Sequence, residues 1–184
     1  AKSGDVLIDG ISVTNLPIHI RARKGLSLLP QETAVFKGLS VLDNLKVASE
    51  LHQTRQRKQE RDGAINNLLA QFDLKKIEER QGKFLSGGEK RRLELARLLV
   101  NSPRYVLLDE PFAGVDPISI NEIKSHISCL ARDNIGVLIT DHNAADILDI
   151  CDNVYVMKDG AIIFEGTPLA VAADETVKSV YLGN

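Results

Sequence analysis

"FLSGGEKRRLELARLLVNSPRYVLLDEP", residues 84–111, joins a serine-glycine-glycine turn, a helical pattern and an apolar run that ends in two carboxylates. Ser86 and Glu89 have the S-x-x-E spacing of a capping box, which predicts that a helix begins at this turn. The continuous apolar run over 105–109 is typical of a strand covered on both faces. The stretch therefore predicts a helix followed directly by a buried strand.

The same alternation continues on both sides of this stretch. Apolar residues at helical spacing predict helical structure over 39–100, and short runs predict strands at 5–10 and 25–32. The expected elements downstream are a helix over 118–131, a second buried strand over 136–140, a helix from about 144 to 150, a hairpin around 158–160 and a helix capped by Thr167 before Pro168. Strands that alternate with helices predict an α/β fold with a largely parallel sheet.

Composition narrows the function classes. The 184 residues suit one domain, or one domain with a subdomain, and the net charge of −2 argues against a nucleic-acid partner. The basic run 55–61 contains Glu60 and is interpreted as a solvated helix face. No apolar stretch is long enough to span a bilayer and no signal peptide leads the chain, so we expect a cytoplasmic protein.

The two cysteines do not indicate a special site. Cys129 and Cys151 are too few for a disulfide framework, and neither lies in a Cys-x-x-Cys or Cys/His cluster. We expect both to be buried, reduced thiols.

Gly87 and Gly88 need an explanation, because a glycine costs a helix roughly 0.5–1 kcal/mol relative to alanine. Without a Cβ, the backbone amides of residues 86–88 are open to a bulky anion. A helix N-terminus carries unpaired N–H groups and a partial positive charge. The turn is therefore predicted to bind a terminal phosphate, with a plain helix cap as the alternative.

Polar side chains follow the two predicted central strands. Asp109 and Glu110 end one strand, and Thr140-Asp141-His142 end the next. Ligands bind beyond the carboxyl ends of strands in open α/β sheets. One carboxylate could hold Mg²⁺, the other could act on an attacking water, and His142 could contact a phosphoryl group. A structural role for these residues stays open at this point.

Together these residues resemble the nucleotide-binding subunits of ATP-binding-cassette (ABC) transporters. The matching segments are the family signature at Leu85–Glu89, Walker B with the catalytic glutamate at Tyr105–Glu110, the D-loop at Ala113–Asp116, the switch histidine at His142 and the Q-loop at Leu29–Glu32. The resemblance covers nearly the whole chain.

The resemblance implies a fold: an incomplete P-loop NTPase core of the RecA-like, ABC type with a helical subdomain inserted. The core would comprise residues 1–38 and 101–184, and the helical subdomain residues 39–100. It also implies ATP and Mg²⁺ as cofactors and a second ATPase subunit bound head to tail.

The resemblance assigns roles to residues as well. Glu110 and His142 would be catalytic, and Asp109 and Gln31 would be near the metal. The nucleotide-binding residues would be Gln31, Ser86, Gly87, Gly88, Glu89 and Asp116, with the signature turn closing on the γ-phosphate held by the partner and Asp116 crossing the interface. A groove near Gln31, Phe36 and Leu42 would receive a membrane permease subunit, with the protein peripheral on the cytoplasmic face of the inner membrane.

Within the family, four stretches are similar to the ATPases that power lipopolysaccharide export. They are residues 29–45, 107–120, 137–143 and 177–184. ATPases of branched-chain amino-acid importers are the alternative, and a non-catalytic remnant that docks on membrane subunits is a third hypothesis.

One family motif is missing from the sequence. A G-x-x-x-x-G-K-[ST] loop wraps the α- and β-phosphates, and Gly82-Lys83 does not supply it because Phe84 follows. The family keeps this loop N-terminal to the motifs seen here, so the resemblance implies that the chain begins in mid-domain, without the P-loop strand and helix. We expect the chain by itself to bind ATP weakly and to hydrolyse none.

Overall fold

The computed structural model describes residues 3–50 and 58–178, which form two compact units divided between Leu138 and Ile139. Each unit is described by itself. The predicted basic helix face at 55–61 lies partly outside the described residues, as does most of the closing stretch 177–184.

A three-stranded sheet organises the first unit. Its strands are β3 (Leu26–Leu29), β4 (Tyr105–Asp109) and β5 (Gly136–Thr140), in that order across the sheet. β3 and β4 run parallel, with Leu26 opposite Tyr105 and Leu29 opposite Leu108. The predicted α/β class is confirmed, and β4 and β5 have the bounds expected from the sequence.

β5 differs from its prediction in burial. It was expected to be covered on both faces, but Leu138 is 56% exposed and no residue of the strand is buried. Among the described residues, β5 stands at the end of the strand order and has β4 as its single neighbouring strand. The apolar run alone could not distinguish an edge position from a central one.

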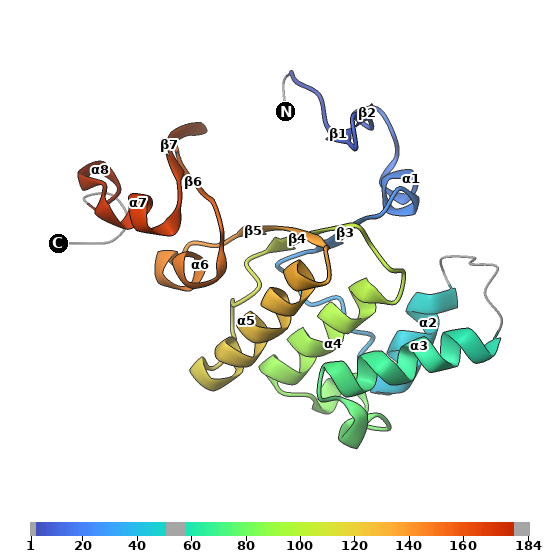
Figure 1. The fold of residues 1–184 in the computed structure, drawn as a ribbon. Helices are drawn as coiled ribbons and strands as arrows, with labels where there is room; N and C mark the ends of the chain where they lie inside the picture. The colour runs from blue at the N-terminus through green and yellow to red at the C-terminus, as the bar shows by residue number, and fades with distance from the viewer. Residues whose placement is uncertain (1–2, 51–57, 179–184) are drawn as a thin grey trace. The chain divides into compact units, whose positions relative to one another are not determined.

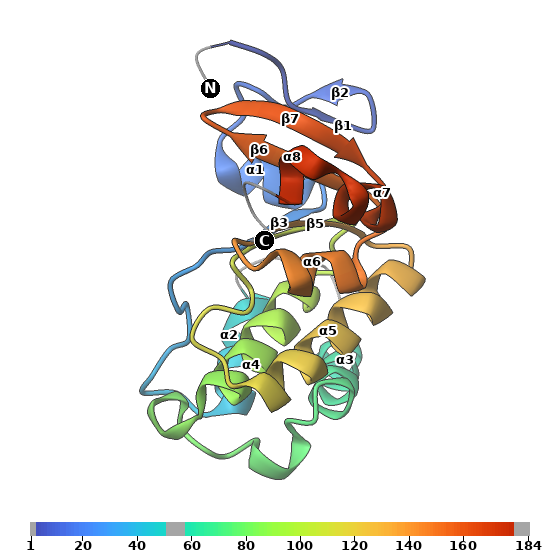
Figure 2. The ribbon, with the colours of Figure 1, turned by 90° about the vertical axis from the view of Figure 1, so that its left-hand side faces the viewer.

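Helices α4 (Gly87–Leu99) and α5 (Pro117–Arg132) lie on the same side of this sheet in both views (Figures 1 and 2). α2 (Val41–Glu50) and α3 (Lys58–Gln71) pack against α4. Two short 3₁₀ turns, η1 (Lys75–Ile77) and η2 (Gly82–Phe84), join α3 to α4. The fully buried side chains at the centre of this layer include Leu45, Leu69, Phe72, Leu74, Leu93, Leu95, Ile123 and Leu130.

The chain begins with a small hairpin and a short helix. β1 (Leu7–Ile8) pairs antiparallel with β2 (Ile11–Ser12) through Asp9-Gly10, the turn expected from the sequence. α1 (Ile18–Arg23) was not predicted. Its sequence, IHIRAR, shows no clear helical period of apolar residues, and none of its residues is buried.

The second unit consists of α6 (Ala144–Ile150), β6 (Val154–Lys158), β7 (Ala161–Gly166), α7 (Pro168–Ala173) and α8 (Glu175–Val177). β6 and β7 form the predicted hairpin. Its turn residues Asp159 and Gly160 have φ of 51° and 79°, as a type I′ turn requires. Thr167 caps α7 as expected, and the valines of β6, α7 and α8 form a small core.

Two further expectations can be compared with the described residues. No helix within 3–50 or 58–178 combines the length and apolarity that a membrane span requires. Cys129 and Cys151 are free thiols, but each is only half-buried, which corrects the prediction that they would be buried.

Candidate functional site

The ends of β3 and β4 bring two predicted motifs together. The two strands are parallel neighbours, and Leu29 lies opposite Leu108. The next residues along each strand, Pro30-Gln31 and Asp109-Glu110, therefore leave the sheet at the same edge. This is the edge at which open α/β sheets bind ligands.

Gln31 and Glu110 are in direct contact at this edge. The amide Nε2 of Gln31 donates a hydrogen bond of 2.7 Å to Oε2 of Glu110. Glu110 has φ of 44°, a left-handed conformation that costs a non-glycine residue on the order of 1–3 kcal/mol. The adjacent Asp109 is exposed. The carboxylate of Glu110 is thus oriented by Gln31, and the exposed side chain of Asp109 lies next to it in the sequence.

The signature turn has the capping box predicted from the sequence. Ser86 Oγ accepts from the Glu89 amide at 3.2 Å, and the Ser86 amide donates to Glu89 Oε2 at 2.8 Å. The other carboxylate oxygen of Glu89 pairs with Arg80 at 2.9 Å. Glu89 is therefore already occupied by protein contacts within the described chain.

Gly87 and Gly88 pack against other parts of the same chain. A Cβ on Gly87 would lie 2.9 Å from the carbonyl oxygen of Gly114, and a Cβ on Gly88 would lie 2.3 Å from Ser119 Oγ. Gly88 is buried, whereas Ser86 and Gly87 are exposed. Close packing onto residues 114–119 thus explains both glycines without a ligand, a reason that the sequence did not reveal.

Asp116 directly precedes α5 and lies beside Gly88. Its carboxylate accepts from the Ser119 amide at 3.0 Å, which makes it the N-cap of α5. Hydrogen bonds from Ser119, first from its side chain and then from its amide, lower the pKa of Asp116. The exposed carboxylate lies near Gly88, so the D-loop and the signature turn are neighbours within one chain.

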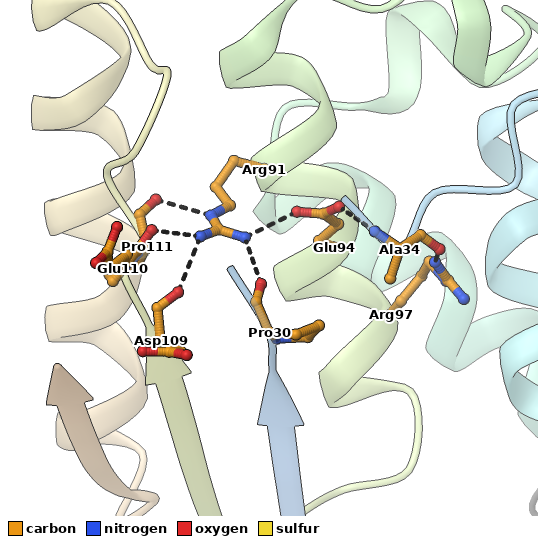
Figure 3. A network of polar contacts seen from close by, with 8 residues as sticks. All are labelled: Pro30, Ala34, Arg91, Glu94, Arg97, Asp109, Glu110 and Pro111. Atoms are coloured by element: carbon orange, nitrogen blue, oxygen red, sulfur yellow. Dashed lines mark hydrogen bonds and ion pairs between the residues drawn. The ribbon is translucent and has the colours of Figure 1, made fainter. Parts of the chain in front are cut away.

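Arg91 is a central residue of the site that sequence reasoning missed. It lies on α4, is 5% exposed, and points toward the strand ends (Figure 3). Its guanidinium donates to the backbone carbonyls of Pro30, Glu110 and Pro111, and to the carboxylate of Glu94. Three consecutive basic residues, 90–92, gave no local signal as to which one turns inward.

His142 belongs to the second unit, immediately after β5. Its side chain is 76% exposed, and Nδ1 lies 3.7 Å from Oδ1 of Asp141, whose side chain is 2% exposed. Oδ1 of Asp141 also accepts from the amide of Asn143, which caps α6. The histidine thus stands at a strand-to-helix turn with a largely exposed side chain.

Known proteins resemble this chain in both sequence and fold. The model of the ABC transporter family matches residues 1–113. The lipopolysaccharide export system ATP-binding protein LptB of Escherichia coli strain K12 is 45% identical over 181 residues, which are 98% of this chain and 75% of LptB. This chain belongs to the ABC transporter family.

Further comparisons place it among the ATP-binding subunits of that family. LptB of Haemophilus influenzae is 46% identical over 180 residues, 98% of this chain and 74% of that protein. Among solved structures, the ADP conformation of MJ1267, described as an ATP-binding cassette of an ABC transporter, is similar with a TM-score of 0.86 and 27% identity. That match covers 99% of this chain and 78% of MJ1267. The ABC family membership also establishes a nucleotide as the type of ligand.

Phe36 and Leu42, which were predicted together with Gln31 to face a membrane permease, differ in exposure. Phe36 is 42% exposed, and Arg97 stacks over its ring with 4.7 Å to the ring centroid. The backbone of Phe36 is fixed by the buried Asn44, which accepts from its amide at 2.9 Å and donates to its carbonyl at 3.1 Å. Leu42 is half-buried on α2. Phe36 is therefore a partly exposed aromatic side chain whose backbone is held by two hydrogen bonds to Asn44.

Proposed function

We propose that this chain carries the hydrolytic and signature residues of the ATP-binding and ATP-hydrolysing subunit of a transporter that exports lipopolysaccharide from the inner membrane; the phosphate-binding loop is not among its 184 residues. The observation that carries the hydrolytic part is the contact between Gln31 and Glu110 at the carboxyl ends of two parallel strands. The export substrate is supported by the 45–46% identity to proteins named LptB.

In this proposal Glu110 and His142 are the catalytic residues. The carboxylate of Glu110 orients and deprotonates the attacking water, and Gln31 holds that carboxylate by its hydrogen bond of 2.7 Å. The exposed imidazole of His142 contacts the γ-phosphate.

The oxygen donors at the strand ends fit Mg²⁺. This ion is usually held by one or two carboxylates with substrate phosphates and water, and the exposed Asp109 and the amide of Gln31 offer such donors. Within the described residues, no three His, Cys, Asp or Glu side chains gather as a metal cluster. Bound Mg²⁺ would neutralise charge on the phosphates. Asp109 would hold it through its water shell.

The signature turn completes the site of a second, head-to-tail subunit. Ser86 and Gly87 offer helix N-terminal groups to the γ-phosphate held by the partner, while Gly88 and Glu89 fix the shape of the turn that presents them. Asp116 crosses the interface. The exposed Ser86 and Gly87 support this role, whereas the buried Gly88 acts through packing.

The proposed organisation follows the family. Residues 1–38 and 101–184 form the nucleotide-binding core, and residues 39–100 form the helical subdomain. A membrane permease docks near Gln31, Phe36 and Leu42 on the cytoplasmic face of the inner membrane. The exposed Phe36 supports this docking position.

The test substitutes Glu110→Gln in the chromosomal gene, so that the protein is assayed as the cell makes it. Glutamine can still accept from Gln31 but is not a base, so ATP hydrolysis should fall about 10²–10⁴-fold while nucleotide binding persists. Lipopolysaccharide release from inner-membrane vesicles should stop. The control is Glu79→Gln, the same change at an exposed position outside the site.

Co-purification identifies the transporter. A tagged chain should bring down membrane proteins of the lipopolysaccharide export system. Recovery of a nutrient permease, with loss of amino-acid uptake in the Glu110→Gln strain, would instead establish an importer. Membrane partners without any ATP hydrolysis would indicate a non-catalytic docking subunit.

A further inference from the structure

Arg91 is a buried cation whose donors are directed mainly at backbone atoms. Its Nε donates to the Pro111 carbonyl at 2.7 Å, and Nη2 donates to the Glu110 carbonyl at 2.6 Å and more weakly to the Asp109 carbonyl at 3.4 Å. Its Nη1 donates to the Pro30 carbonyl at 3.3 Å and to Glu94 at 3.0 Å. A buried guanidinium is tolerated when its N–H groups are satisfied in this way.

The carbonyls bound by Arg91 belong to the two segments that carry the hydrolytic pair. Pro30 directly precedes Gln31, and Glu110 contributes its own carbonyl. The backbone of Glu110 is in the left-handed region with φ of 44°. Hydrogen bonds from Arg91 to the carbonyls of Glu110 and Pro111 hold the chain in this turn (Figure 3). From this turn the carboxylate of Glu110 accepts the hydrogen bond of Gln31.

α4 also grips the chain beyond Gln31. Glu94 is 3% exposed and accepts from the Ala34 amide at 2.8 Å, while Arg97 donates to the Ala34 carbonyl. Arg91, Glu94 and Arg97 are spaced at i, i+3 and i+6, so they lie along one face of the helix. The segment 30–34 is thus tied to α4 at both of its ends.

We propose that Arg91 is the positioning residue of the hydrolytic site: it aligns Glu110 with Gln31 and ties both to the helix that begins at the signature turn. This inference rests on the proposed ATPase function. Because Arg91 lies little more than one helical turn after Ser86, a shift of the start of α4 is passed directly to the backbone of Glu110.

The first test is Arg91→Lys. Lysine keeps the charge, but its single ammonium cannot span carbonyls on two separate segments as a guanidinium fork does. The kcat for ATP hydrolysis should fall about 10–100-fold, with the Kd for ATP changed less than about twofold, because displacement of a reacting group acts on the chemical step. In a Glu110→Gln background, Arg91→Lys should cause no further loss of kcat.

The matched control is Arg92→Lys. Arg92 is the next residue of the same helix, but it pairs with Glu122 of α5 and not with the strand ends. It should leave kcat within about twofold of wild type, since it lies outside the positioning contacts. All variants are produced from the chromosomal gene and compared by thermal unfolding.

A second variant keeps the inference testable if Arg91→Lys does not fold. Glu94→Gln preserves the shape of the side chain but removes the charge that holds Nη1 of Arg91. Its kcat should fall several-fold, again with nearly unchanged Kd.

The outcomes distinguish the positioning role of Arg91 from the proposed ATPase function. A folded Arg91→Lys or, failing that, a folded Glu94→Gln with wild-type kcat would overturn the positioning role and leave the ATPase function intact. An additional loss of kcat in the Glu110→Gln background would also overturn it. Hydrolysis that is insensitive to Glu110→Gln would contradict the proposed function itself, and the positioning role with it.

Discussion

Gly88→Ala should destabilise the chain, because the volume that a side chain would need is already filled by α5. A Cβ at this position would lie 2.3 Å from Ser119 Oγ and 2.5 Å from Ser119 Cβ. Rotation of the serine hydroxyl relieves only the first contact. The second requires the beginning of α5 to move away by about 1 Å, since carbon atoms in contact stay roughly 3.5–4.0 Å apart.

The expected magnitude follows from this overlap. Overpacking of a tight contact costs about 1–3 kcal/mol. For a chain of 150–250 residues, each kcal/mol shifts Tm by roughly 2–4 °C, so Gly88→Ala should lower Tm by about 2–12 °C. Thermal unfolding followed by circular dichroism at pH 7.5 measures the shift.

A double substitution shows whether Ser119 is the cause. In a Ser119→Gly background, which removes both crowding atoms, Gly88→Ala should lose most of its penalty. If Gly88→Ala instead leaves Tm unchanged or raises it in the wild-type background, the packing explanation is wrong. The glycine would then have to be explained by what binds at the turn.

Two further predictions concern stability. Gly63→Ala should raise the free energy of unfolding by about 0.5–1 kcal/mol, because glycine in a helix loses more conformational entropy on folding than alanine does. Gly63 is exposed within α3, and no atom lies within 4 Å of its Cβ position, so the added methyl group fits. A lower Tm for Gly63→Ala would contradict this. Burial lowers the pKa of His126, whose ring packs on Phe72 with 4.7 Å between centroids. The imidazole of His126 therefore binds a proton less readily in the folded state than in the unfolded chain. The free energy of unfolding should be highest above pH about 6.5, the ordinary pKa of histidine, and should fall as the pH is lowered below it. Tm measured from pH 7.5 to 5.0 should show a shallower decline in His126→Gln than in wild type; equal slopes would refute the assignment.

Local patterns predicted the elements whose signals lie within a few residues of one another. The capping box at Ser86–Glu89, the cap at Thr167 and the hairpin turn at Asp159-Gly160 are all present. Each depends on hydrogen bonds or dihedral angles that neighbouring residues decide by themselves. The strand Tyr105–Asp109 was equally clear, because an apolar run between polar segments has few alternatives.

The features that sequence did not predict depend on residues far apart in the chain. The exposure of Leu138 depends on where β5 falls in the sheet. The need for Gly88 depends on Ser119, thirty-one positions later in the sequence. The inward turn of Arg91 depends on carbonyls contributed by two other segments.

The sequence identified the proposed hydrolytic residues but not the contact between them. Gln31 was singled out through a family resemblance and Glu110 first through its place at a strand end, and the structure brings their side chains into contact across 79 positions of sequence. Their roles, and that of His142, stay predictions. The contact itself could be anticipated only through the parallel pairing of β3 with β4, which places both residues at one edge.

The contacts of Arg91 would be hard to detect by comparing the sequences of related proteins. Apart from Glu94, its partners are main-chain oxygens, and every amino acid carries such an oxygen. Replacement of the side chain at position 30 or 111 would leave the acceptor in place, so no compensating change at position 91 would be required. A search for paired substitutions across many sequences would therefore overlook this junction, although it joins three separate stretches of the polypeptide.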